Sequence, residues 1–211
     1  FHYFYSMISR FHFLTQDLTQ FTHQELAEIA CKSGIQWLQL RVKNQNFDTY
    51  LQIAKDVKNI CKYFNTTLII NDDVALCKAV NADGVHLGKN DMPIAKAREI
   101  LGNKVIIGAT ANTLEDCIQH QNNGANYIGL GPYKFTSTKE NLSSILGLQS
   151  YKQIVNASKG IIKIPIIAIG GIKVEDVQPI LQTGIYGIAV SSAINLSAEK
   201  EKTIADFLNQ F

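Results

Sequence analysis

Residues 163–192 read KIPIIAIGGIKVEDVQPILQTGIYGIAVSS. The four consecutive apolar residues from Ile166 to Ile169 predict a strand over residues 165–169 that is buried on both faces, as in a parallel sheet. The pattern that follows predicts a helix over residues 174–182, which ends before Gly184. Residues 188–190 predict the next strand. This order of strand, helix and strand is typical of a parallel βα repeat.

The same alternation extends through the rest of the chain. We expect the other strands over residues 11–14, 37–42, 68–70, 85–87, 105–107 and 127–130. We expect the other helices over residues 24–32, 47–64, 74–80, 93–101, 114–122, 148–158 and 198–211. Regular alternation is compatible with an open doubly wound sheet or a closed barrel. Eight units without an interruption favour a single-domain (β/α)8 TIM barrel that comprises residues 1–211.

Composition narrows the class of protein. The chain has 211 residues, of which 46% are hydrophobic and 18% charged, and its formal net charge is +2. These values are typical of one compact domain and give no sign of nucleic-acid binding. No apolar run is long enough to cross a membrane, and the first 13 residues lack the order of a signal peptide. We therefore expect a cytoplasmic protein whose four cysteines, all in predicted helices, are reduced and packed.

Polar side chains cluster where the second strand ends. Gln39, Arg41 and Lys43 alternate with Leu40 and Val42. Because alternate residues of a strand point to the same side, the amide and the two cations should point together. Active residues of such barrels lie at the carboxyl ends of the strands. The group therefore predicts a site for an anionic, planar substrate, the alternative being a solvated loop edge.

The next two strand ends carry carboxylates. Asp72 and Asp73 follow Asn71 at the end of the third strand, and Asp91 follows the fourth strand. Mg²⁺ commonly takes one or two carboxylates and completes its shell with water and phosphate oxygens. We expect Asp72 and Asp91 to hold Mg²⁺ and Asp73 to cap the helix that begins at Val74. Helix capping is the alternative for Asp91.

The last three strand ends suggest phosphate recognition. The loop over residues 131–139 carries three hydroxyl groups and two lysines, the alternative being a flexible polar loop. Gly170-Gly171 follows the seventh strand and Ser191-Ser192 follows the eighth. Glycines let backbone N–H groups approach an anion, and barrels often bind phosphate between these two loops.

Taken together, these motifs resemble the thiamine phosphate synthase family over nearly the whole chain, as far as Ile194. The resemblance rests on Gln-x-Arg-x-Lys at residues 39–43, Asn-Asp at 71–72, the aspartate at 91, the loop from Gly131 to Lys139, Gly-Gly at 170–171 and Ser192. The family joins a hydroxymethylpyrimidine diphosphate to a thiazole phosphate and releases pyrophosphate. The resemblance thus implies a transferase of thiamine biosynthesis with a Mg²⁺ cofactor and a dissociative substitution.

The resemblance also implies a role for each matching position. Asp72 and Asp91 would hold Mg²⁺ on the diphosphate, and Arg41, Lys43 and Lys139 would serve catalysis by neutralising the departing pyrophosphate. Gln39 and Asn71 would hold the pyrimidine. The full set of implied substrate contacts is Gln39, Leu40, Arg41, Val42, Lys43, Asn71, Thr110, Thr136, Ser137, Thr138, Lys139, Gly171, Ser191 and Ser192. Thr110 stands where the family usually has Ser, and Ser191 stands where it is often apolar.

Three alternatives remain open. A thiazole tautomerase-like barrel would share the thiazole phosphate site, and a non-catalytic binding protein for thiamine precursors would keep the phosphate loops. Retention of Asp72, Asp91 and Lys139 argues against both. A phosphate-using barrel from tryptophan or histidine synthesis would leave the Gln-x-Arg-x-Lys segment without a purpose. The expected partners are the two small-molecule substrates, with no nucleic acid and no membrane, and association into a homo-oligomer is left open.

Overall fold

The computed structural model describes residues 7–135 and 144–211 and shows a closed barrel of eight strands in the order β1 to β8. Every neighbouring pair of strands is parallel, including β1 with β8. The predicted (β/α)8 fold is therefore confirmed. The strands are β1 (Phe11–Leu14), β2 (Trp37–Leu40), β3 (Thr67–Asn71), β4 (Gly84–Leu87), β5 (Ile106–Ala111), β6 (Tyr127–Leu130), β7 (Ile166–Ile169) and β8 (Gly187–Val190).

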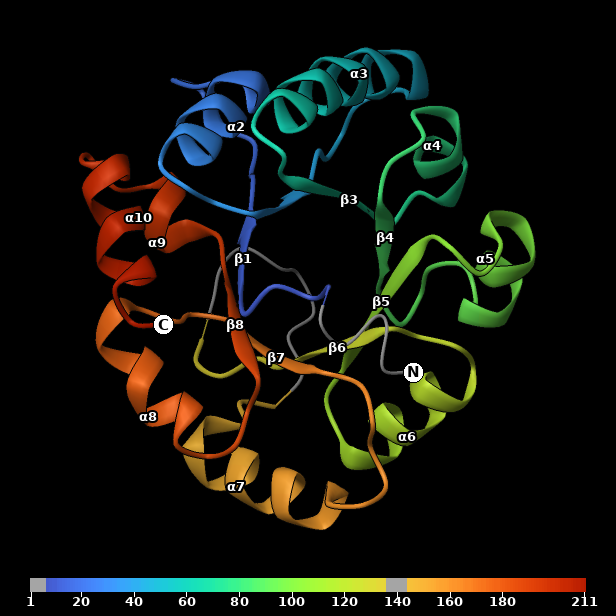
Figure 1. Cartoon of the computed structure of the whole chain (residues 1–211), viewed down its shortest axis with the longest axis vertical. Coiled ribbons are helices and arrows are strands. Elements are labelled where there is room, and N and C mark those ends of the chain that lie inside the picture. Colours follow the sequence, from blue (N-terminus) through green and yellow to red (C-terminus); the bar gives the residue numbers. More distant parts are fainter. Residues whose placement is uncertain (1–6, 136–143) are drawn as a thin grey trace.

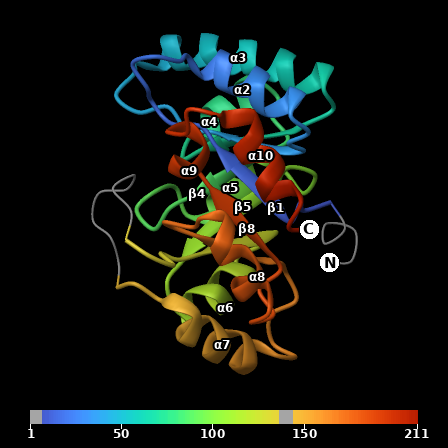
Figure 2. The same ribbon diagram turned by 90° about the vertical axis from the view of Figure 1, so that its left-hand side faces the viewer.

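The helices form a ring around the strands (Figure 1). Seen from the side, α2 and α3 lie at one end of the molecule and α7 lies at the other, with β1 and β8 between them (Figure 2). The helices are α2 (His23–Lys32), α3 (Phe47–Tyr63), α4 (Val74–Ala79), α5 (Ile94–Leu101), α6 (Leu114–Asn122), α7 (Gly147–Ser158), α8 (Val177–Leu181), α9 (Ser192–Asn195) and α10 (Lys200–Leu208).

Most helix ends lie within one residue of the sequence prediction, but α10 is shorter than the predicted 198–211, and two further helical segments differ in kind. The single helix predicted over 174–182 is a 3₁₀ turn, Val174–Asp176, followed by the five-residue α8. The short helix α9 was not predicted, because four residues directly after a strand give no readable helical period. The predicted limits of β1, β6 and α6 are confirmed.

Local capping explains where several helices begin. Thr22 forms a capping box with Glu25 at the start of α2, and Thr113 forms one with Asp116 at the start of α6. In each box two backbone N–H groups that lack helical partners are satisfied by side-chain oxygens. Asp73 accepts a hydrogen bond of 2.8 Å from the backbone N–H of Leu76 and caps α4, as predicted.

Alternation along the strands separates two apolar layers. The larger cluster lies between the strands and the helices and includes outward-facing residues such as Leu38, Leu40 and Ile128. The smaller cluster comprises Ile8, Leu14, Trp37, Ile69, Ile106, Tyr127, Ile167 and Ala189. In the inner set the rings of Trp37 and Tyr127 meet edge to face, with centroids 5.5 Å apart. The interior of the barrel is thus a packed core, and the mouth above it is the place for polar chemistry.

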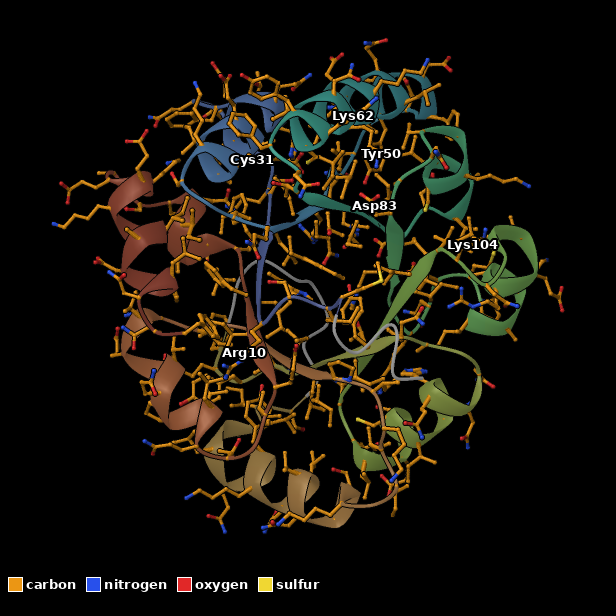
Figure 3. All side chains as sticks on the ribbon, in the orientation of Figure 1. Arg10, Cys31, Tyr50, Lys62, Asp83 and Lys104 are labelled. Carbon is orange, nitrogen blue, oxygen red and sulfur yellow. The ribbon has the colours of Figure 1, made fainter. Side chains whose placement is uncertain are left out.

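The cysteines are part of the packing. Cys31, Cys61, Cys77 and Cys117 all carry free, buried thiols, and they lie on α2, α3, α4 and α6, as predicted. Cys31 is labelled on α2 in Figure 3. Over the residues that the structure describes, none of the helices has the length and hydropathy to cross a membrane.

Candidate active site

The base of the mouth is formed by two amide side chains. Gln39 on β2 and Asn71 at the end of β3 are both buried, and the Gln39 Nε2 donates a hydrogen bond of 2.8 Å to the Asn71 Oδ1. The inward orientation of Gln39 agrees with the alternation read from the sequence. The bond fixes both amides, which leaves the Asn71 Nδ2 to donate and the Gln39 Oε1 to accept.

Arg41 and Lys43 follow directly after β2, which ends at Leu40 instead of the predicted Val42. The strand ends early because the backbone N–H groups of Arg41 and Lys43 bond to side chains that follow β1, and not to backbone carbonyl groups of that strand. The Arg41 N–H donates to the Thr15 Oγ1 at 3.1 Å, and the Lys43 N–H donates to the Asp17 Oδ2 at 3.1 Å. The N–H groups of both residues therefore point towards the segment that follows β1.

Lys43 connects β2 to the carboxylates of the next strands. Its Nζ lies 2.6 Å from the Asp72 Oδ2. Asp72 in turn lies close enough to Asp91 for each carboxyl group to shift the pKa of the other. The structure thus brings together the residues that the sequence predicted for the cation and metal positions on β2, β3 and β4.

The two carboxyl groups differ in their acidity. Burial raises the pKa of Asp72, but the hydrogen bonds from Lys43 and Asp91 and the charge of Lys43 outweigh it, so that the net pKa lies below the ordinary value. Burial and the neighbouring Asp72 raise the pKa of Asp91. Two carboxyl groups this close repel each other when both are ionised, and a cation between them would remove that cost.

Asp91 does not cap the following helix. Its Oδ2 accepts a hydrogen bond of 2.6 Å from the backbone N–H of Gly88, whereas α5 begins without a side-chain cap. This contact closes the loop after β4 and turns the carboxyl group towards Asp72. Of the two alternatives raised by the sequence, the structure therefore excludes helix capping for Asp91.

Leu40 and Val42 do not present their side chains to the mouth. Both belong to the outer apolar cluster, and Leu40 is fully buried. The Leu40 carbonyl also accepts a hydrogen bond of 2.9 Å from Tyr50. Both residues were among the expected substrate contacts. Because their side chains point outward, only their main-chain atoms can face the mouth.

Thr110 lies on β5 and is tied to a buried chain of polar groups. Its Oγ1 lies 3.0 Å from the Nε2 of His86, whose Nδ1 lies 2.9 Å from the Tyr127 hydroxyl. Inside the barrel the Tyr127 hydroxyl group is fully shielded from solvent, and burial raises its pKa. His86 and Tyr127 thus hold the Thr110 hydroxyl at the edge of the mouth.

The loop after β6 runs along the end of β7. The Tyr133 N–H donates to the Ile169 carbonyl at 2.8 Å, and the Lys134 N–H donates to the Gly170 carbonyl at 2.9 Å. Gly170 and Gly171 have φ angles of 104° and 66°. A Cβ at Gly171 would lie 2.6 Å from the carbonyl oxygen of Phe135. The glycine pair therefore has a structural reason, namely the close approach of this loop.

Four of the expected residues, Thr136, Ser137, Thr138 and Lys139, lie outside the described residues. On the neighbouring strand end, the Ser191 Oγ donates to the Gln16 Oε1 at 3.2 Å and accepts from the Asn195 Nδ2 at 3.1 Å. Ser192 begins α9. Gly171, Ser191 and Ser192 thus follow adjacent strands at the same end of the barrel.

Sequence reasoning missed the residues that follow β1. The side chains of Thr15 and Asp17 contact the backbone of Arg41 and Lys43. The ring of His23 contacts the side chains of Thr15 and Asp17. Their spacing of two at a strand end is the same signal that drew attention to residues 41 and 43. Sequence reasoning also missed Asp176, a buried residue whose Oδ1 lies 2.6 Å from the Lys134 Nζ.

The chain is similar to known proteins over most of its length. A sequence model described as "Thiamine monophosphate synthase" matches residues 12–194. A protein from Flavobacterium psychrophilum named thiamine-phosphate synthase is 49% identical over 90% of this chain and 93% of its own length. One of the same name from Bacteroides thetaiotaomicron is 46% identical over 86% of this chain and 88% of its own.

A solved structure supports the same grouping. Thiamine phosphate pyrophosphorylase from Pyrococcus furiosus superimposes with a TM-score of 0.85 at 31% identity, covering 95% of this chain and 94% of that one. A 3-hexulose-6-phosphate synthase matches with a TM-score of 0.67 at 14% identity, which shows the shared barrel alone. The resemblance seen in the sequence is confirmed: the chain belongs to the thiamine monophosphate synthase family, and it is a transferase.

Proposed function

We propose that this transferase joins 4-amino-2-methyl-5-pyrimidinylmethyl diphosphate to 4-methyl-5-(2-phosphoethyl)thiazole and gives thiamine phosphate and pyrophosphate. The single observation that carries the proposal is the 2.6 Å ion pair of Lys43 with Asp72 at the mouth, beside the carboxyl group of Asp91 whose pKa Asp72 raises. A cation and two carboxylates from three adjacent strands suit a metal-bound diphosphate. A site for a phosphate monoester alone does not need the carboxylates.

The residues present fit Mg²⁺. Asp72 and Asp91 offer only oxygen donors, which Mg²⁺ prefers, and their mutual repulsion favours a bound cation. Among residues 7–135 and 144–211 there is no group of three or more His, Cys, Asp or Glu that could hold a metal ion. A Mg²⁺ ion held by two carboxylates, with water and phosphate oxygens at its other coordination positions, does not require such a group. When bound, Mg²⁺ neutralises charge that develops on the departing diphosphate.

The protein groups at this side of the mouth bind and orient the pyrimidine diphosphate. Gln39 and Asn71 face it with amide donors and acceptors. Arg41, Lys43 and Lys139 offset the negative charge on the leaving group. The 4-amino group of the pyrimidine can stabilise a methylene cation, so the bond to the diphosphate can break before the new bond forms. The protein then has mainly to stabilise the leaving group and exclude water.

The opposite side of the mouth binds the thiazole phosphate. Backbone N–H groups near Gly171, Ser191 and Ser192 supply its donors, and the family resemblance adds the side chains of residues 136–138. Thr110 completes the set of contacts between the two substrates. The thiazole nitrogen then captures the methylene cation, and no protein base is needed, because this nitrogen carries no proton to remove.

The finer setting of the enzyme is part of the same proposal. A cytoplasmic location agrees with the four free, buried thiols. Neither nucleic acid nor membrane is a partner in the reaction as proposed. Association into a homo-oligomer through the helices remains an expectation from the barrel architecture.

The test is release of pyrophosphate by the purified protein with Mg²⁺ and both substrates. We expect release only when all three are present, with thiamine phosphate formed in equal amount. Binding of both substrates without release would instead support a precursor-binding protein. Binding of the thiazole phosphate alone would support a tautomerase-like barrel.

Lys139→Ala separates the two sides of the mouth in the same assay. The substitution should slow pyrophosphate release more than it weakens binding of the thiazole phosphate, because the charge of Lys139 is assigned to the leaving group. Equal losses in both would contradict that role.

A further inference from the structure

The parallel pairing of β1 with β2 continues beyond the last residue of each strand. The backbone N–H of Thr15 donates to the Gln39 carbonyl at 3.0 Å, which is the last rung made by two backbones. The next two N–H groups on the β2 side, those of Arg41 and Lys43, are accepted by side-chain oxygens of Thr15 and Asp17. Residues 15 and 17 are two positions apart, as are residues 41 and 43. The side-chain oxygens of residues 15 and 17 therefore take the place of the backbone carbonyl groups that a longer β1 would offer.

One imidazole ring fixes both of these side chains. The His23 Nδ1 lies 2.9 Å from the Thr15 Oγ1, and its Nε2 lies 2.9 Å from the Asp17 Oδ1. His23 is the first residue of α2, whose start is set by the Thr22 capping box. The helix therefore places the ring between the two side chains.

The hydrogen bonds assign a consistent role to every group. With the ring proton on Nε2, His23 donates to the Asp17 carboxylate and accepts at Nδ1 from the Thr15 hydroxyl. Thr15 then accepts from the Arg41 N–H with its remaining lone pairs. Thr15 is fully buried and His23 is 7% exposed, so water competes little for the contacts of Thr15, whereas the side chain of Asp17 is 47% exposed.

We propose that Thr15, Asp17 and His23 form a brace that holds the backbone of residues 41–43 in place and so presents Arg41 and Lys43 as an aligned pair of cations. This deepens the proposed function, because the pair is the part of the mouth assigned to the diphosphate. The three brace residues act as positioning residues. Thr15 and Asp17 touch the backbone of the cationic residues, His23 acts through these two side chains, and in the proposed reaction none of the three touches substrate. Alignment before binding saves the ordering that each cation would otherwise undergo.

The brace accounts for what holds the backbone of this segment in place. Arg41 and Lys43 lie beyond the end of β2, where a loop would ordinarily be free to turn. The ion pair of Lys43 with Asp72 restrains only the tip of one side chain. The brace instead fixes the backbone from which both side chains project.

Hydrogen–deuterium exchange of the full chain without ligand tests the brace. Thr15→Val keeps the shape of the side chain and removes the acceptor. It should speed exchange of the Arg41 amide about fivefold, the equivalent of losing about one net hydrogen bond, and exchange of the Lys43 amide less, because Asp17 still accepts that N–H. Thr15→Ser retains the hydroxyl and should exchange as the wild type does.

Thr183→Val is the matched control. Thr183 is also a buried threonine, and its hydroxyl donates to the Ile180 carbonyl far along the chain, before β8. It should leave the Arg41 and Lys43 amides unchanged. Unchanged exchange in Thr15→Val, or equally fast exchange in the control, would overturn the brace.

Titration with inorganic pyrophosphate and Mg²⁺ tests the consequence for the cations. Thr15→Val should bind pyrophosphate about fivefold more weakly and raise the KM for the pyrimidine diphosphate. The KM for the thiazole phosphate should not change, and Thr15→Ser should restore the wild-type values. Faster exchange with unchanged pyrophosphate affinity would overturn the link to the cation pair. A wild type that binds no pyrophosphate would contradict the proposed function, whereas the ligand-free exchange would still decide on the brace.

Discussion

Two lysine–aspartate ion pairs lie near opposite ends of the barrel and differ in what surrounds them. Lys58 pairs with Asp83 at 3.0 Å just before β4, and Asp83 also accepts the Leu68 N–H at 2.7 Å. Asp83 is labelled in Figure 3. Lys43 pairs with Asp72 at 2.6 Å beyond the carboxyl ends of the strands, where Asp72 also meets the carboxyl group of Asp91.

The difference concerns charge balance. Before β4, the single carboxylate of Asp83 has one ammonium group and one backbone donor, so it fastens α3 and β3 to the start of β4. At the mouth, two carboxyl groups share the ammonium group of Lys43, which leaves negative charge for a metal ion to neutralise. The same pair of residue types thus serves structure at one end and, in the proposed function, binding at the other.

The largest effect is expected from Asp72→Asn. Asp72 has a φ angle of 67°, a conformation that Asn tolerates, so the backbone should keep its shape. We expect turnover to fall by about 100-fold or more, because a metal ligand contributes several kcal/mol in the transition state. The measurement is pyrophosphate release over a Mg²⁺ titration, with circular dichroism to check the fold. Turnover equal to wild type at every Mg²⁺ concentration would rule out the metal assignment.

The second prediction exchanges the two lysines separately. Lys43→Met should lower kcat/KM about 30-fold, which corresponds to about 2 kcal/mol of lost charge stabilisation. Lys58→Met is the matched control and should leave kcat/KM unchanged, with at most about 1 kcal/mol lost from the free energy of unfolding, because the pair is partly exposed. Urea unfolding and steady-state kinetics of both variants provide the check. Similar losses of kcat/KM in the two variants would contradict the assignment of a binding role to the ion pair at the mouth and a structural role to the ion pair before β4.

The third prediction concerns His12, a histidine on β1 that points into the barrel. His12 is buried and stacks on Trp37, and burial lowers the pKa of its ring to about 3. A lowered pKa favours folding above the unfolded value of about 6.5, and this stabilisation is lost as the pH falls from there towards 3. The contribution is about 1.4 kcal/mol per pH unit.

Replacing His12 by Phe checks the sign and the size of this dependence. The variant lacks the titrating group and keeps the stacking surface. Between pH 6 and pH 4.5 its free energy of unfolding should fall less steeply than that of the wild type, as measured by urea denaturation. Parallel curves for the two proteins would show that His12 does not contribute.

The smallest effect is expected from Asp91→Asn. Asn can still accept the hydrogen bond from Gly88, so the loop after β4 should persist. Mg²⁺ should raise the Tm of the wild type by a few degrees, on the order of 1 kcal/mol, because it binds only the folded protein. The variant should lose most of that shift in a thermal melt with and without Mg²⁺. An equal shift in both would place the cation elsewhere.

Much of the fold could be predicted because each strand and helix carries its own signal. The limits of β1 and β6 follow from short apolar runs, and α6 is set by Thr113 and by the turn at Asn123 and Gly124. Asp73 was separated from Asp72 by the same reasoning, since a residue just before a helix is the one able to cap it. These are local effects that a single sequence reveals.

The rest depends on contacts between distant segments. The end of β2 at Leu40 depends on side chains of Thr15 and Asp17, which the register with β1 places beside it. The turn of Asp91 towards Asp72 depends on the Gly88 N–H. Such contacts need the three-dimensional register, and the pattern of residue types does not supply it.

The filled interior of the barrel determines how molecules enter and leave. Ile8, Trp37, Ile106 and Tyr127 pack across the axis below the mouth. Both substrates and both products must therefore pass through the same opening at the carboxyl ends of the strands. Pyrophosphate that lingers there occupies the position of the incoming diphosphate, so product inhibition should compete with the pyrimidine substrate. The order of departure then sets how soon the next cycle can begin.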